Sequence, residues 1–142
     1  MSDEGVDRRT IVVLNKRFEG GRLFSALGHV VLGLGADAVK HDDLWIQEYR
    51  DADGIAYPHI SYHPVIILKA DNGNHLRRFR QELEELGLPF SSFVHTMFEG
   101  GTPVQLSTTE KTPSDELDYV AVATFGSSEA LRPLTRKFRV YS

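Results

Sequence analysis

Cysteine is absent from this chain of 142 residues. Its absence excludes thiol nucleophiles, cysteine-ligated zinc, iron–sulfur clusters and a disulfide framework. No apolar run approaches the ~18–20 residues that cross a bilayer. The first residues, MSDEGVDRR, carry charges where a signal peptide needs an apolar segment. We therefore expect a cytoplasmic protein with no membrane segment.

Basic residues are also in short supply, because 16 lysines and arginines face 20 acidic residues and the net charge is −4. A protein that holds nucleic acid through its phosphates is usually basic. The balance therefore argues against a general nucleic-acid binder. A local basic pocket remains compatible with it, because a patch matters more than the total. His59 and His63 lie between prolines and so off a helix, and we expect neither a metal nor a cofactor.

The size and the apolar content fit one domain over residues 1–142, with a core over about 10–141 and a flexible stretch at 1–8. The mass is 16.0 kDa and hydrophobic residues make up 41% of the chain. A chain of this mass buries roughly two-thirds of its surface on folding. It can therefore build a core without metal or disulfides.

Hydrophobic patterning predicts an α/β fold. We expect strands at 10–15, 64–70, 90–98 and 117–126, and helices at 22–39, 76–86 and from Ser127 to near Arg136. Residues 42–63 suggest a hairpin that turns at Asp53–Gly54, 100–116 is typical of a loop, and the tail FRVY suits an edge strand. This order predicts a three-layer α/β/α sandwich with a small mixed sheet of about four core strands. The helix at 22–39 is apolar nearly all round, which predicts deep packing.

One polar stripe interrupts that apolar helix. Arg22, Ser25 and His29 follow at i, i+3 and i+7 and so share a face. The loop before them contains Gly20 and Gly21 and leaves the end of the first strand, where open α/β sheets place ligands. Free N–H groups at the helix start would favour an anion there. The structural alternative is that Arg22 is a surface residue and His29 a satisfied core histidine.

The start of the second helix is unusually basic. Arg77, Arg78 and Arg80 crowd its first turns, against the preference of the helix dipole for acids there. A sequence can accept this arrangement if the arginines hold an anion. The alternative is an ordinary solvated helix face.

His95 and Thr96 lie near the end of the third predicted strand. Strand ends on one side of a sheet border a common crevice. Both residues can therefore face the same crevice as the first helix.

The stretch IVVLNKRFEGGRLFSALGHVVLGLGA resembles the type II peptidyl-tRNA hydrolase superfamily, whose first helix carries a G-K-x-A-A-Q-x-x-H-A pattern. Gly21, Arg22, Ser25 and His29 fall on the family's Gly, Lys, second Ala and His. Over about residues 10–141 the chain is more closely similar to a family catalogued as a domain of unknown function (number 2000). The matching segments are GHVVLGLGA, YRDADG, PVIILKA, ELGLPFSSFVHTMF, VAVATFG and LTRKF.

The resemblance implies a three-layer sandwich, in agreement with the patterning, but it does not carry the activity across intact. The hydrolase lysine falls on Arg22, which keeps the charge but does not deprotonate. The family's glutamine falls on Ala26, and its acid falls on His95. The helix histidine and a cation are therefore retained, whereas the acid and the amide are not.

Three hypotheses follow. The first is a module that binds a small anion or nucleotide through Asn15, Lys16, Gly20, Gly21, Arg22, Ser25 and Thr96. The second is a diverged hydrolase of a peptidyl-tRNA-like or other ester substrate, with Arg22, His29 and His95 as its catalytic residues. The third is a dimeric, partner-binding protein with a vestigial pocket, which an exposed apolar patch near Trp45 would favour.

Overall fold

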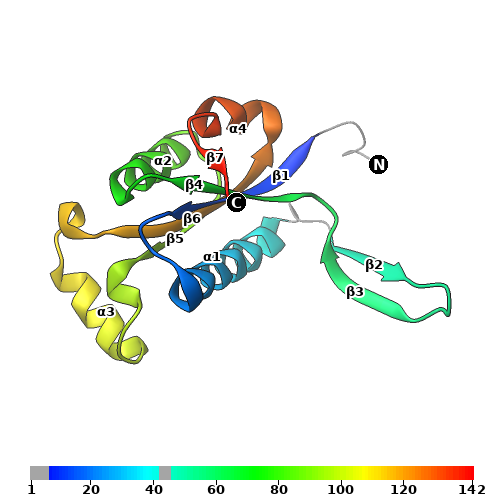
Figure 1. The fold of residues 1–142 in the computed structure, drawn as a ribbon, viewed down its shortest axis with the longest axis horizontal. Coiled ribbons are helices and arrows are strands. Elements are labelled where there is room, and N and C mark those ends of the chain that lie inside the picture. The colour runs from blue at the N-terminus through cyan, green and yellow to red at the C-terminus, as the bar shows by residue number, and fades with distance from the viewer. Residues whose placement is uncertain (1–6, 42–45) are drawn as a thin grey trace.

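The computed structural model describes residues 7–41 and 46–142, which form one five-stranded sheet, a separate two-stranded hairpin and four α-helices (Figure 1). The strands are β1 (Arg8–Asn15), β2 (Ile46–Arg50), β3 (Ala56–Ser61), β4 (Val65–Ala70), β5 (Phe90–Val94), β6 (Tyr119–Ser127) and β7 (Arg139–Val140). The helices are α1 (Gly20–His41), α2 (Gly73–Glu85), α3 (Thr102–Lys111) and α4 (Ser128–Thr135).

The five-stranded sheet has the order β5-β6-β1-β4-β7 and is mixed. β1 is parallel to β4 and antiparallel to β6, and β5 and β7 close the two edges. Both β1 and β6 are almost wholly buried, because their continuous apolar runs have helices on both faces. The strands predicted at 10–15, 64–70 and 117–126 are confirmed, and the FRVY tail supplies the edge strand β7.

Helices cover both faces of this sheet (Figure 1). Leu23, Val30 and Leu34 of α1 pack on one face with side chains of β1, β5 and β6. On the other face, Phe79 of α2 and Leu131 of α4 pack against β1, β4 and β6. The structure therefore confirms a mixed α/β fold with helices on the two sides of the sheet.

The predicted deep packing of α1 is wrong. One stripe faces the sheet and is buried, but Phe24 is 66% and Leu32 is 75% exposed on the outer side. An outer helix covers only the stripe that faces its sheet, and apolar composition does not reveal how many sides are covered. Among the helix glycines, a Cβ at Gly33 would lie 2.9 Å from Oγ of Ser91, whereas Gly28 has no neighbour within 4 Å. Close packing therefore explains Gly33 and not Gly28.

Two predicted elements after α2 need correction. The strand predicted at 90–98 ends at Val94 and is followed by a 3₁₀ turn (His95–Met97). The predicted loop at 100–116 contains α3 and a second 3₁₀ turn (Ser114–Glu116). No residue of α3 is buried, so it lacks the apolar stripe that reveals a helix in a sequence. Pro103 in its first turn is the helix-start signal that the sequence does contain.

The hairpin predicted within 42–63 is confirmed as β2–β3, and it extends away from the sheet (Figure 1). The carboxylate of Asp51 organises its turn by accepting from the backbone N–H groups of Ile55 and Asp53 and from the hydroxyl of Tyr57. These hydrogen bonds, that from Ile55 first, hold the pKa of Asp51 below its usual value. Trp45, near which an apolar patch would favour a partner-binding role, lies outside the described residues.

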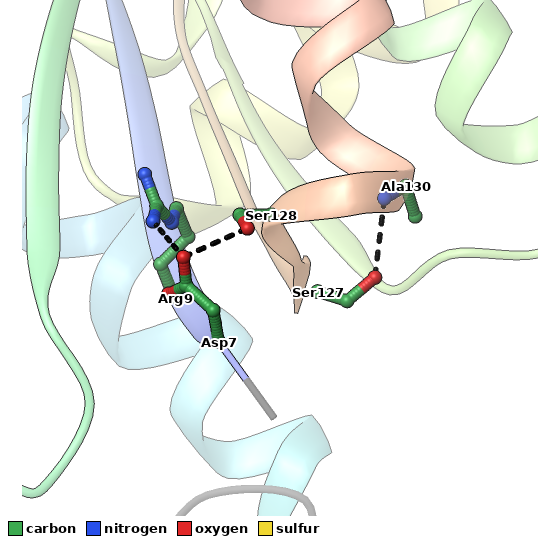
Figure 2. Close-up of polar contacts among 5 residues, drawn as sticks. All are labelled: Asp7, Arg9, Ser127, Ser128 and Ala130. Atoms are coloured by element: carbon green, nitrogen blue, oxygen red, sulfur yellow. Dashed lines mark hydrogen bonds and ion pairs between the residues drawn. The ribbon is translucent and has the colours of Figure 1, made fainter. Parts of the chain in front are cut away.

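The start of β1 is tied to the start of α4, as Figure 2 shows. The carboxylate of Asp7 pairs with Arg9 at 2.6 Å and accepts from Oγ of Ser128 at 2.8 Å. The hydrogen bond from Arg9, followed by that from Ser128, lowers the pKa of Asp7. The neighbouring Ser127 caps α4, because its Oγ accepts from the N–H of Ala130 at 3.1 Å. β1 begins at Arg8, two residues before the start of the strand predicted at 10–15.

Candidate functional site

Arg22 lies in the first turn of α1 and lines a cavity of about 630 Å³, here called the Arg22 cavity. Its guanidinium donates to the Glu99 carboxylate at 2.6 Å and lies 4.8 Å from the ring centroid of Phe98. The glutamate side chain is 83% exposed, so water surrounds most of this ion pair. The remaining lining comes from Phe18, His95, Thr96, Gly100, Val104, Thr108 and Asp118.

His95 follows β5 directly and is fixed in one orientation by Asp118, which precedes β6. Its backbone N–H donates to the carbonyl of Asp118 at 2.9 Å, and its Nδ1 accepts from the backbone N–H of Asp118 at 3.0 Å. A neutral imidazole that accepts at Nδ1 carries its hydrogen on Nε2. His95 therefore offers the Arg22 cavity a hydrogen-bond donor.

A second cavity of about 550 Å³, here called the His29 cavity, adjoins the first. Phe98 and Gly100 line both, so they form the partition between them. His29 is exposed on α1, with its ring 5.5 Å from that of Phe93, and Ser25 lies one turn earlier. Val30, Ser92, Met97 and residues of α3, including Gln105, Leu106 and Thr109, complete the lining.

The structure thus brings together only part of the predicted site. Arg22, His95 and Thr96 line one cavity, whereas Ser25 and His29 line the next. The three predicted catalytic residues do not share a single cavity. His29 is also not a core histidine, because it lies on the exposed side of α1.

Gly20 and Gly21 form the first turn of α1 and are not among the lining residues of either cavity. Gly20 has φ +69°, a left-handed conformation that glycine adopts without strain and other residues rarely do. It lets the chain turn from the end of β1 into the helix. The pair therefore places Arg22 without lining the cavity itself.

Asn15 and Lys16 line neither cavity and bind other parts of the chain. Asn15 is fully buried, its amide donates to the carbonyl of Tyr119 at 2.8 Å, and its Oδ1 accepts from the N–H of Arg17 at 2.9 Å. The first bond holds the end of β1 against β6, and the second stays within the turn that follows β1. Lys16 reaches the Asp71 carboxylate at 3.0 Å, beyond the end of β4, and lines neither cavity.

The model of a family described as "Protein of unknown function (DUF2000)" matches residues 8–142. The chain belongs to this family. The match confirms the resemblance to the domain of unknown function that the sequence motifs indicated over residues 10–141.

One solved structure similar to this DUF2000 chain is the protein of unknown function Atu0240 from Agrobacterium tumefaciens strain C58. The two chains are 18% identical, with a TM-score of 0.79 over 96% of this chain and 98% of the other. At this identity the likeness shows a shared fold. No curated protein matches the chain.

Sequence reasoning missed several residues that shape the two cavities of this DUF2000 protein. Glu99 and Asp118 supply negative charge to the Arg22 cavity, and Phe18 and Phe98 supply rings 5.7 Å apart. Thr109 of α3 shares a hydrogen bond of 2.7 Å with Thr96 and joins α3 to the 3₁₀ turn. Because the composition of 100–116 indicates a loop, its side chains had no predicted position. The helix-start proline of α3 was the available signal.

Across residues 7–41 and 46–142, no group of three or more histidine, aspartate and glutamate side chains is arranged to hold a metal ion. Within the same ranges no helix is long and apolar enough to cross a membrane.

Proposed function

We propose that the protein is a binding module for a small anionic molecule, such as a nucleotide, whose anionic group pairs with Arg22. The observation that carries the proposal is the pairing of Arg22 with Glu99. An arginine binds a carboxylate or phosphate in two parallel hydrogen bonds. Glu99 is 83% exposed and can swing into water, so a ligand anion can take its place at little cost.

The size and lining of the cavities support a ligand that also has an apolar part. Volumes of about 630 and 550 Å³ fall within the range of small-molecule sites, ~300–1,000 Å³. Phe18 and Phe98 present rings beside Arg22, and Met97 and Leu106 line the adjoining His29 cavity. An anionic group at Arg22 and an aromatic or apolar body across Phe98 would use both cavities.

The orientation of His95 favours binding over general-base catalysis. A general base needs a free lone pair within reach of the proton that it removes. Nδ1 of His95 already accepts from Asp118, and Nε2 carries hydrogen. In this state His95 donates a hydrogen bond to an anion beside Arg22, as a binding residue does.

Ester hydrolysis is the second candidate, and the position of Asp118 favours it. The resemblance left the hydrolase acid without a counterpart, yet Asp118 lines the Arg22 cavity together with His95. A carboxylate, an imidazole and a guanidinium are groups that hydrolases use. For hydrolysis, His95 would have to give up the hydrogen bond that its Nδ1 accepts from Asp118, so that this nitrogen could take a proton. His29 would act from the adjoining cavity.

Titration calorimetry with nucleoside monophosphates, aryl phosphates and aryl carboxylates tests the binding role. We expect saturable 1:1 binding by at least one class, weakened about tenfold or more in Arg22→Ala, because a charge-assisted pair contributes ~1.5–3 kcal/mol. Arg136→Ala is the matched control, since Arg136 is exposed and its side chain has no partner within the described residues. Equal loss in both variants, or no saturable binding by any class, would contradict the proposal.

A hydrolysis assay separates the two candidates. With an N-blocked aminoacyl-tRNA as substrate, the binding proposal predicts no release above the rate in buffer. Turnover that falls at least tenfold in both Arg22→Ala and His29→Ala, about 1.4 kcal/mol in each case, would instead establish the hydrolase.

A further inference from the structure

A third cavity lies at the start of α2, and its lining is markedly basic. It has a volume of about 260 Å³ and lies where β4 ends, α2 begins and β7 runs back along the sheet edge. Cationic side chains from all three regions border it, together with one carboxylate. We call it the basic cavity, lined by Lys69, Asp71, His75, Arg78, Lys137 and Arg139.

Like charges face each other across the strands that form it. Lys69 of β4 and Arg139 of β7 are direct partners in the antiparallel register. Direct cross-strand pairs of like charge destabilise a sheet. Asp71 is their nearby acid, but it lies 3.9 Å from Arg139 and is already bonded to Lys16 at 3.0 Å. Lys137 pairs with Glu82 of α2 at 3.3 Å, so within the described ranges Lys69 and Arg78 are the lining cations without a carboxylate partner.

Of the three arginines at the start of α2, two have side-chain partners within the described ranges and one has none. Arg77 donates to the carbonyls of Ser114, Asp115 and Leu117 and so fastens the second 3₁₀ turn to the helix. Arg80 pairs with Glu84 at 3.0 Å and lies 5.1 Å from the ring centroid of Phe90. Arg78 lines the basic cavity and has no ion pair within the described ranges. Of these three arginines, Arg78 is the one whose side chain has neither a hydrogen bond nor an ion pair within the described ranges, and it lines the cavity.

The place in the fold also suits an anion. The parallel strands β1 and β4 both end here, just before Lys16 and Asp71, and open α/β sheets bind ligands at the carboxyl ends of such strands. α2 begins at the same point, with no acid in its first turn. Asn72 caps the helix by accepting from the N–H of His75 at 3.0 Å, and the positive end of the helix dipole adds to the field of the cationic side chains.

We infer that the basic cavity is a binding site for a phosphate group, either free phosphate or the phosphate of a small phosphomonoester. Two arguments select this class. Two lining cations without a carboxylate partner in the described ranges, Lys69 and Arg78, call for a ligand with more than one negative charge, which a phosphate supplies and a single carboxylate lacks. The volume is below the ~300–1,000 Å³ of sites for drug-sized molecules, which suits a single small group. This site is separate from the Arg22 cavity and does not depend on the function proposed above.

Titration calorimetry of the full chain with inorganic phosphate, pyrophosphate and methyl phosphate, which lack the aromatic body proposed for the Arg22 cavity, tests the inference, with acetate at matched ionic strength as the charge control. We expect saturable 1:1 binding of at least one phosphate compound and none of acetate. Arg78→Ala should weaken it at least tenfold. Arg80→Ala, on the same helix but outside the cavity, should stay within about twofold of the wild type.

A stability measurement gives the second readout. Lys69→Gln removes one half of the like-charge pair, so this variant should lose phosphate affinity and yet melt at the same or a higher temperature than the wild type without phosphate. Phosphate should raise the melting temperature of the wild type and not that of the variant.

Three results would overturn the inference. One is the absence of saturable binding of all three phosphate compounds. Another is equal weakening in Arg78→Ala and Arg80→Ala, which would mean that phosphate only screens the surface. The third is tight binding of a single-stranded RNA that phosphate does not compete away, which would assign the basic residues to an extended nucleic-acid surface.

Discussion

The Arg22 cavity and the basic cavity use arginine in two different electrical settings. In the first, the cation already has a partner, because Glu99 bonds to Arg22 at 2.6 Å, and Asp118 adds a further carboxylate. In the second, Asp71 is the one carboxylate among several cations, and Arg78 is without an ion pair in the described structure. A ligand of the first cavity must displace a carboxylate. A ligand of the second relieves a repulsion.

This difference also separates the kinds of ligand. The Arg22 cavity is large and lined by aromatic rings, so most of its contact with a ligand is apolar and its single cation fixes orientation. The basic cavity is small and its lining is chiefly charged, so its selectivity rests on the charge of the ligand. Substitutions that alter charge should therefore change the ligand affinities of the two sites differently.

Gly73→Ala should have the largest effect, because Gly73 packs closely against Asp118, which lines the Arg22 cavity. It opens α2 beside the basic cavity, and a Cβ there would overlap Oδ1 of Asp118 and lie 3.0 Å from the backbone nitrogen of Tyr119. Overpacking of this kind costs about 1–3 kcal/mol. Urea unfolding measures the loss, and ligand binding should weaken in both cavities.

The control for that experiment is Gly28→Ala. Gly28 is also helical, but a Cβ added to it would meet no atom within 4 Å. Replacing it should stabilise the protein by about 0.5–1 kcal/mol, because alanine favours the helix more than glycine. If Gly28→Ala lost as much stability as Gly73→Ala, the close contacts at Gly73 would not be the cause of the loss.

Glu99→Gln should make the Arg22 cavity resemble the basic cavity. The variant removes the competing charge from Arg22, so anion affinity there should rise about two- to fivefold, the range set by an exposed ion pair of ~0.5–1 kcal/mol. Phosphate binding in the basic cavity should not change. Calorimetry of the same ligands in wild type and variant measures both. A fall in anion affinity would mean that Glu99 positions Arg22 and does not compete with the ligand.

Asp71→Asn should have the smallest effect on stability, a loss that is present near neutral pH and disappears as the pH falls. The hydrogen bond from Lys16, followed by the charges of Lys16 and Arg139, lowers the pKa of Asp71. A carboxyl with a lowered pKa stabilises the fold above its unfolded pKa of about 3.9 and loses that contribution as pH falls through the folded value. Melting temperatures from pH 6 to pH 3 should therefore fall more steeply in the wild type than in the variant. Parallel curves would contradict this account.

The parts of the fold that were predictable are those in which a local pattern reflects burial. β1 and β4 are continuous runs of β-branched residues, and α2 carries Leu76, Phe79 and Leu83 on one stripe. α3 was missed because it buries nothing and has no stripe to detect. The exposed face of α1, with Phe24 and Leu32, was missed because composition does not show what covers a helix.

The candidate sites were predictable to a smaller extent. Arg22 and His95 follow from strand ends and from the resemblance, and both line the Arg22 cavity. Its partners Glu99 and Asp118 come from segments without a pattern. The basic cavity is lined by residues of β4 and β7, which lie far apart in the sequence. The antiparallel pairing of these two strands brings Lys69 and Arg139 together. The cluster of arginines on α2 was visible, but not which of them lacks a partner.

The position of β1 at the centre of the sheet sets the order in which the chain can fold. β1 pairs on one side with β4 and on the other with β6, whose residues lie more than 100 positions later, as in Ile11 with Thr124. Contacts so distant in sequence slow folding. During synthesis β1 and β4 can pair while the other edge of β1 still waits for β6. Until then an apolar strand edge is open to other chains, and this nascent stage is where aggregation competes most strongly with folding.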